Sequence, residues 1–245
     1  NQMYTGKHIA TKLWVGDYTT GDTFEKFAQK AEGIKRIGVL RADVDNLGQT
    51  FVAGFAGKYA TLSRTAALSR QLSIFFKYYI RSILKNGEYH IDGEKKLTER
   101  NATIVYSGGD DVFIVGAWNE VIELSIDLQE KFKKYTQGTL SISSGIGIYE
   151  CTYPIGAIAN ETGEMEAESK RMPEKDSVTF MDDGETHLIN ELEICDGTYR
   201  WEELYKSVLG EKYDVIQDFL GESDERGMSF LYRMLELIRN QKEKI

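Results

Sequence analysis

The sequence has few of the residues that build disulfide-stapled folds or histidine-based metal sites. Its 245 residues include only two cysteines, Cys151 and Cys195, which are too few for a disulfide framework or a zinc ribbon. The three histidines are scattered and form neither an HD pair nor an HxxxH pair, which excludes metal hydrolysis by histidine ligands. We therefore expect a chain that folds around a hydrophobic core in a reducing cytoplasm.

The sequence also lacks an excess of basic residues and any long apolar run. Its 30 Lys and Arg residues face 39 Asp and Glu residues, for a formal net charge of −9, so nucleic acid has to be contacted locally or through partners. No stretch reaches the roughly 20 apolar residues of a membrane span, and we expect no signal peptide at the start of the sequence. With 41% hydrophobic residues and two prolines, the composition indicates one large or two modest compact domains and no membrane partner.

What the sequence does contain is an acidic turn between two apolar segments. Gly108-Gly109-Asp110-Asp111 separates the β-like runs 102–107 and 112–116. We expect a tight hairpin whose glycines supply positive φ and let a phosphate approach the backbone. Adjacent aspartates repel each other unless a cation lies between them, and Mg²⁺ or Mn²⁺ prefer such oxygen ligands. The alternative is an acidic hairpin turn that binds nothing.

A second acidic segment makes the metal interpretation stronger. Residues 35–43 read as a strand that ends at Asp43, before a short helix over 47–55. In a βαββαβ sheet of order 4-1-3-2, the end of the first strand lies beside the turn between the second and third, so Asp43 should face Asp110 and Asp111. Three carboxylates at one sheet edge are the geometry of a two-metal nucleotidyl-transfer site. Asp45 is expected either to support these ligands or to cap the following helix.

The spacing of apolar residues in the rest of the chain predicts the other elements of an α+β domain. Apolar spacing predicts helices over 62–84 and 119–135, and alternation predicts strands over 140–148 and 177–180. A helix after Pro154 leads to Lys170 and Lys175. Their ammonium groups either hold a triphosphate as point charges or belong to a solvated charged loop.

These elements divide the chain into three parts. Residues 1–34 are expected to be a lead-in, residues 35–182 a ferredoxin-like palm domain, and residues 183–245 a small all-α domain. Helices are predicted there over 201–209, 213–220 and 230–238. Their apolar faces pack either within the chain or on a neighbouring subunit.

Three segments together carry a resemblance to one family. They are residues 36–48 (RIGVLRADVDNLG), 106–111 (YSGGDD) and 224–227 (DERG). From Trp14 to the end, the chain resembles the large signature subunit of type III-A (Csm) CRISPR effector complexes, in the part that holds the second palm domain and the C-terminal helical domain. The palm of that family is similar to those of GGDEF nucleotidyl cyclases and polymerases.

The resemblance implies an antiviral function for the chain. It implies synthesis of cyclic oligoadenylate from ATP, triggered by target RNA in a complex with guide RNA and other subunits. The 3′-hydroxyl of one adenosine attacks the α-phosphate of another ATP, and pyrophosphate leaves. Asp43 and Asp110 are implied as ligands of Mg²⁺ or Mn²⁺, the Val44 carbonyl as an auxiliary ligand, and Asp111 as a second ligand or base. The residues implied to line the nucleotide are Ser107, Gly108 and Gly109.

The same resemblance implies that part of the machinery is missing from this sequence. The family begins with an HD nuclease domain, a first palm domain and a cysteine-rich zinc module, and it binds ATP between two palms. We therefore expect a half-site with little activity alone and assign no DNA cleavage to it. Two alternatives remain: a GGDEF-type diguanylate cyclase, whose Glu-Phe hairpin ending is absent here, and a non-catalytic nucleotide-binding scaffold, which would not need three carboxylates.

Overall fold

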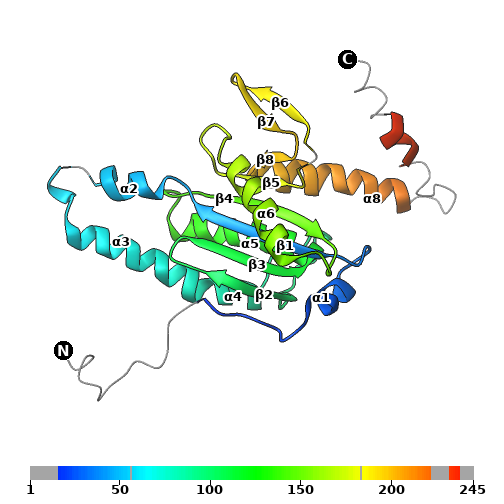
Figure 1. Ribbon diagram of the computed structural model, residues 1–245, viewed down its shortest axis with the longest axis horizontal. Helices are drawn as coiled ribbons and strands as arrows, with labels where there is room; N and C mark the ends of the chain where they lie inside the picture. The colour runs from blue at the N-terminus through cyan, green and yellow to red at the C-terminus, as the bar shows by residue number, and fades with distance from the viewer. Residues whose placement is uncertain (1–15, 56, 183, 222–231, 238–245) are drawn as a thin grey trace. The chain divides into compact units, whose positions relative to one another are not determined.

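The computed structural model describes residues 16–55, 57–182, 184–221 and 232–237 (Figure 1). The chain divides into two compact units, residues 1–201 and 202–245. Among the described residues, no helix combines the length and apolar character needed to cross a membrane.

A six-stranded sheet of order β2-β3-β1-β4-β5-β8 organises the first unit. Its strands are β1 (Ile37–Val44), β2 (Ala102–Ser107), β3 (Asp111–Ala117), β4 (Ile142–Tyr149), β5 (Ser177–Phe180) and β8 (Thr198–Arg200). β1 pairs antiparallel with both β3 and β4, and β5 runs parallel to β4. The predicted order of the first four strands is confirmed, and the α+β palm fold with it.

Helices cover both faces of this sheet. α5 (Trp118–Tyr135) packs on one face, which we call the back, and α6 (Ile155–Ser169) packs on the other, the front (Figure 1). α1 (Phe24–Lys30) is capped at its N-terminus by Thr23, whose hydroxyl accepts a hydrogen bond from the Lys26 amide. The predicted helix over 62–84 is present as α3 (Leu62–Ile74), a π-helical segment (Phe75–Tyr79) and α4 (Ile80–Lys85). Short helices, α2 (Leu47–Ala53) and a 3₁₀ turn (Gly57–Tyr59), lead into it.

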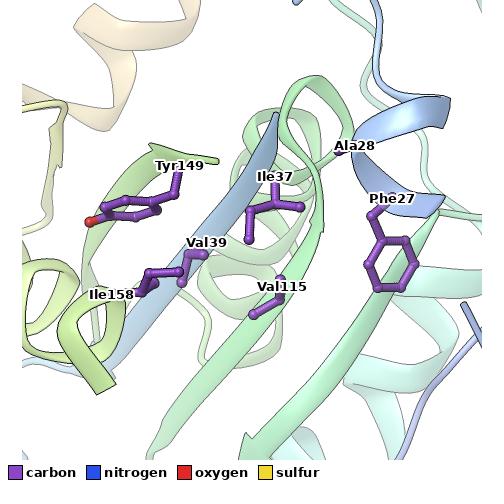
Figure 2. Packing of buried hydrophobic residues seen from close by; sticks show 7 residues of the cluster. All are labelled: Phe27, Ala28, Ile37, Val39, Val115, Tyr149 and Ile158. Atoms are coloured by element: carbon purple, nitrogen blue, oxygen red, sulfur yellow. The ribbon is translucent and has the colours of Figure 1, made fainter. Parts of the chain in front are cut away.

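The front core fixes which β1 side chains reach the site. Figure 2 shows Ile37 and Val39 of β1 packed with Val115 of β3 and with side chains from α1, α6 and β4. Successive side chains of a strand alternate between the two faces of the sheet. Because Ile37 and Val39 face the front, the same alternation carries Arg41 and Asp43 to the front at the end of the strand.

Residues 186–200 form strands, whereas the sequence suggested an all-α segment from residue 183. β6 (Thr186–Ile189) and β7 (Leu192–Cys195) make a separate hairpin, and Asn190 and Glu191 both have positive φ at its turn. β8 then returns to the main sheet beside β5. The structure therefore divides the chain after Trp201, not at 182/183. β6, β7 and β8 have only three or four residues each, so alternation in them is a weak signal, and the sequence reasoning missed them.

The second unit is helical where it is described. α7 (Trp201–Glu203), a π-helical segment (Leu204–Lys212) and α8 (Tyr213–Gly221) follow one another without a break. The predicted helix over 230–238 is described only at residues 232–237, which are helical. The DERG segment at 224–227 lies outside the described residues.

The close approach of α6 to β4 yields a stability prediction. A Cβ on Gly145 would lie 2.5 Å from both the Glu166 amide nitrogen and the Thr162 carbonyl oxygen of α6. Because these are backbone atoms of a packed helix, we expect Gly145→Ala to lower the free energy of unfolding by about 2 kcal/mol. Gly156 in α6 has open space around its Cβ position. The control Gly156→Ala should raise that free energy by about 0.5 kcal/mol in the same urea titrations; equal stabilities would contradict this account.

Candidate functional site

The β2–β3 turn lies beside the end of β1. Asp43 is directly opposite Asp111 in the antiparallel pairing of β1 with β3. The amide of Val44 donates a hydrogen bond to the carbonyl of Asp110, with 3.1 Å between nitrogen and oxygen. Residues opposite each other in such a pair point to the same face of the sheet. The structure thus brings Asp43, Asp110 and Asp111 to one sheet edge.

The proximity of these carboxylates is unfavourable by itself. Burial raises the pKa of Asp110 above its ordinary value, and the negative charges of Asp43 and Asp111 raise it further, while the Lys170 ammonium opposes the shift. Like charges opposite each other on neighbouring strands destabilise a sheet. The three carboxylates therefore repel one another, and a cation placed between them would reduce that repulsion.

Lys170 is the cation that the chain itself supplies. Its ammonium forms an ion pair with Asp43 and lies 2.6 Å from the Glu166 carboxylate. Glu166 is in turn held by Arg41 of β1, at 3.3 Å. Although burial alone lowers the pKa of Lys170, its hydrogen bonds to Asp43 and Glu166 raise that pKa above its ordinary value. Lys170 therefore stays charged and points into the site.

Lys175 lies at the rim of the site, away from the carboxylates. Its ammonium donates to the side-chain oxygen of Asn46 at 2.8 Å. Glu174, Lys175 and Asp176 all have positive φ, at 69°, 57° and 48°. Such a left-handed run of non-glycine residues is strained, and the surrounding structure has to hold it.

Asp45 holds this turn instead of capping a helix. Its buried carboxylate accepts hydrogen bonds from the hydroxyls of Ser141 (2.8 Å) and Ser143 (3.0 Å) and from the amide of Asp176 (3.2 Å). The N-cap of α2 is Asn46, whose side chain makes no capping hydrogen bond. The helix-capping role expected for Asp45 is therefore wrong. Its hydrogen bonds tie the end of β1 to β4 and to the 174–176 turn, and a role in supporting the metal ligands stays a prediction.

The hairpin glycines do not have the positive φ that was expected. Their lack of a Cβ matters instead, because it leaves room for neighbouring groups. Neither Gly108 nor Gly109 belongs to the positive-φ residues of the described chain. A Cβ on Gly108 would lie 2.3 Å from the Tyr106 hydroxyl and 2.5 Å from an Asp111 carboxylate oxygen, whereas nothing lies within 4 Å of one on Gly109. Gly108 thus makes room for protein side chains, and Gly109 leaves space open beside the carboxylates.

Ser107 faces away from these carboxylates. Its hydroxyl is buried and donates to the carbonyl of Phe76 at 2.6 Å, on the back of the sheet. Strand alternation explains this, because Ser107 is paired with Val112, which is buried, while Asp111 faces front. The Ser107 side chain is therefore unavailable on the front, and only its backbone remains for the nucleotide contact expected from the sequence.

Tyr106 belongs to the site, although the sequence reasoning gave it no role. A β-bulge between Ile104 and Tyr106 shifts the register of β2 against β3 and leaves Val105 and Tyr106 both half-exposed. The negative charge of Asp111, then burial, then the hydrogen bond to the same carboxylate raise the pKa of Tyr106. The sequence signal that could have predicted this role is the tyrosine directly before the Ser-Gly-Gly turn.

The donor set suits a hard divalent cation, yet it is not gathered around one point. In the part of the chain that the structure describes, no three His, Cys, Asp or Glu side chains are close enough together to hold a metal ion. Carboxylate oxygens are nonetheless the ligands that Mg²⁺ and Mn²⁺ prefer. Two of the three carboxylates already have partners, Asp43 in Lys170 and Asp111 in Tyr106. Mg²⁺ is usually held by one or two carboxylates together with substrate phosphates, so the donor set fits such an ion by its chemistry and not by its present spacing.

Comparisons with known proteins agree with this fold and motif. Residues 36–179 match the family described as Cas10/Cmr2, second palm domain. The whole chain is 44% identical over 250 residues to a Mycobacterium tuberculosis protein named CRISPR system single-strand-specific deoxyribonuclease Cas10/Csm1 (subtype III-A). Two crystal structures of a Csm1–Csm4 cassette, one in complex with one ATP and one with cA3, match 80% of the chain at 29% identity, with TM-scores of 0.67 and 0.66.

The match covers only a part of each relative. The chain spans 29% of the length of the Mycobacterium tuberculosis protein and 28% of the matched chain in each cassette structure. The matched family segment nevertheless contains Asp43, Asp110 and Asp111 together with both lysines discussed above. The chain therefore belongs to the Cas10/Cmr2 family, with residues 36–179 as its second palm domain, and the relatives named above are subtype III-A (Csm) members of that family.

Proposed function

We propose that this chain supplies one of the two palm domains of a synthase, which joins ATP molecules into cyclic oligoadenylate within a type III-A CRISPR effector complex. The observation that carries the proposal is the convergence of Asp43, Asp110 and Asp111 at one sheet edge, with the pKa of Asp110 raised by its acidic neighbours. The matched cassettes, whose names record ATP and cA3, support it.

The proposed reaction is attack of a 3′-hydroxyl on the α-phosphate of a second ATP, with pyrophosphate as the leaving group. Asp43 and Asp110 are the proposed ligands of Mg²⁺ or Mn²⁺, with the Val44 carbonyl as an auxiliary ligand and Asp111 as a second ligand or base. When bound, the metal lowers the pKa of the attacking hydroxyl and neutralises charge on the phosphate oxygens.

The other residues of the site bind and orient the nucleotide in this proposal. Lys170 and Lys175 contribute positive charge to the triphosphate. The open space at Gly109 admits a phosphate close to the backbone, and Gly108 keeps Tyr106 beside Asp111. Substrate positioning of this kind accounts for much of catalysis in phosphoryl transfer.

The proposed partners follow from the incompleteness of the site. We place the chain in the cytoplasm, beside the other subunits of the type III-A complex, with guide and target RNA bound by the assembly. A net charge of −9 fits RNA contacts that are supplied mostly by partners. A second palm completes the pair of ATP sites, so the chain alone is expected to synthesise little.

One observation favours a second candidate, a non-catalytic nucleotide-binding scaffold of the same complex. The described carboxylates are not gathered tightly enough to hold a metal ion. A scaffold, however, gains nothing from three carboxylates that repel one another. Metal-dependent turnover in the assembled complex separates the two candidates.

The first prediction concerns the two adjacent aspartates. Asp110→Asn combined with Asp111→Asn should reduce oligoadenylate synthesis at least 100-fold, because the hard oxygen ligands are lost. The measurement is mass spectrometry of products from ATP and Mn²⁺, in a complex reconstituted with partner subunits, guide and target RNA. Asp214→Asn combined with Asp218→Asn, at two exposed positions of α8, is the charge-matched control and should keep wild-type synthesis. Unchanged synthesis in the double variant contradicts the proposal, and product from GTP alone would favour a diguanylate cyclase.

A second prediction uses the stability of the same site. Because the folded-state pKa of Asp110 lies above its ordinary value, its ionised form destabilises the fold at neutral pH, and this penalty disappears as the pH falls through that pKa. Asp110→Asn should therefore raise the melting temperature at pH 7 without metal, and the gain should shrink near pH 4. Excess Mn²⁺ should stabilise the wild type more than the variant, because only the wild type keeps the full ligand set. A lower melting temperature of the variant in metal-free buffer at pH 7 would refute this account.

A further inference from the structure

Opposite charges alternate along the front of the sheet beside the site. Arg41 contacts Glu166, Glu166 contacts Lys170, and Lys170 contacts Asp43. The side chains of Lys170 and Asp43 are 24% and 27% exposed, and that of Glu166 is 11% exposed. These ion pairs are half-sheltered from water, so they are screened less than pairs on the open surface.

The Lys170 ammonium affects metal binding because it is paired with a carboxylate oxygen of Asp43. That oxygen is among those that a divalent cation needs in the proposed site. In the metal-free protein, the ammonium also reduces the repulsion among the three aspartates, as its effect on the pKa of Asp110 shows. A lysine and a divalent cation therefore compete for the same negative charge.

Glu166 is a second carboxylate partner for the Lys170 ammonium. It lies one helical turn before Lys170, within 2.6 Å of its ammonium, and Arg41 keeps it in position. The Lys170 ammonium can thus leave Asp43 without losing all its compensation. The flexible four-carbon stem of lysine allows such a shift with little change in the backbone.

We propose that Lys170 is an internal counter-cation, which neutralises Asp43 until a divalent cation binds and then turns toward Glu166 and the arriving triphosphate. The inference rests on the proposed function and adds to it a coupling between the binding of metal and the binding of triphosphate. Metal alone has to displace Lys170 without compensation, whereas metal bound to a nucleoside triphosphate offers Lys170 new phosphate oxygens. Binding of metal and of triphosphate is therefore mutually reinforcing.

The chain supplies a matched control in Lys175. Its ammonium carries the same charge at the rim of the same site, but it contacts the neutral side chain of Asn46 and not an aspartate. Removing either lysine changes the net charge by the same amount. Only the removal of Lys170 takes a competitor away from Asp43.

The test is a Mn²⁺ titration of the full 245-residue chain without nucleotide, followed by electron paramagnetic resonance of free Mn²⁺. Lys170→Met should bind Mn²⁺ roughly three- to tenfold more tightly than the wild type, because an opposing charge is gone. Lys175→Met should stay within about twofold of the wild type, and Lys170→Arg, which keeps the charge, should restore wild-type affinity. Adding a non-hydrolysable ATP analogue should tighten Mn²⁺ binding more in the wild type than in Lys170→Met.

Two outcomes separate this inference from the function on which it rests. If Lys170→Met and Lys175→Met bind Mn²⁺ equally, while Asp110→Asn with Asp111→Asn abolishes binding, the counter-cation role is overturned and the metal site stands. If the double aspartate variant binds Mn²⁺ like the wild type, the metal site itself is overturned, and the inference with it. Thermal unfolding of each variant without metal shows that the comparison is made between folded chains, and Lys170→Gln replaces any Lys170→Met sample that does not fold.

Discussion

The register between β1 and β3 is the constraint on which the site depends. It places Asp43 opposite Asp111 and joins the Val44 amide to the Asp110 carbonyl. A slip of one residue would turn Asp111 to the back of the sheet and separate the carboxylates. The hydrophobic core prevents that slip, because Ile37 and Val39 of β1 are buried with Val115 on the front face.

The packing of α6 on β4 connects this register with the charges of the site. Gly145 lets the backbone of α6 come close to the sheet, and α6 carries Glu166 and delivers Lys170 at its end. The ion pairs of Lys170 are therefore set by van der Waals packing some distance from the aspartates. Apolar packing between α6 and the sheet fixes the position of the backbone. The backbone position in turn determines which charged side chains come into contact.

Much of this arrangement follows from local patterns in the sequence. Alternation and helical periodicity predicted the individual strands and helices. The βαββαβ topology with strand order 4-1-3-2, which was assumed for these elements, then predicted that Asp43 meets Asp110 and Asp111. The features that were missed depend on contacts between distant segments: the bulge that exposes Tyr106, the Lys170–Asp43 ion pair and the return of β8 to the sheet. The expected positive φ of the hairpin glycines was wrong, since turn composition does not reveal which neighbours crowd a residue.

The bulge that turns Tyr106 toward Asp111 also shapes the outer edge of the sheet. β2 is the terminal strand, and such a strand presents unpaired amide and carbonyl groups on which another chain can add. Here the bulge interrupts that row, and the segment at Tyr18 and Thr19 covers part of it through a hydrogen bond to Ile104 and a bridge to Thr103. The irregularity that leaves Tyr106 half-exposed thus also interrupts the strand edge on which another chain could add.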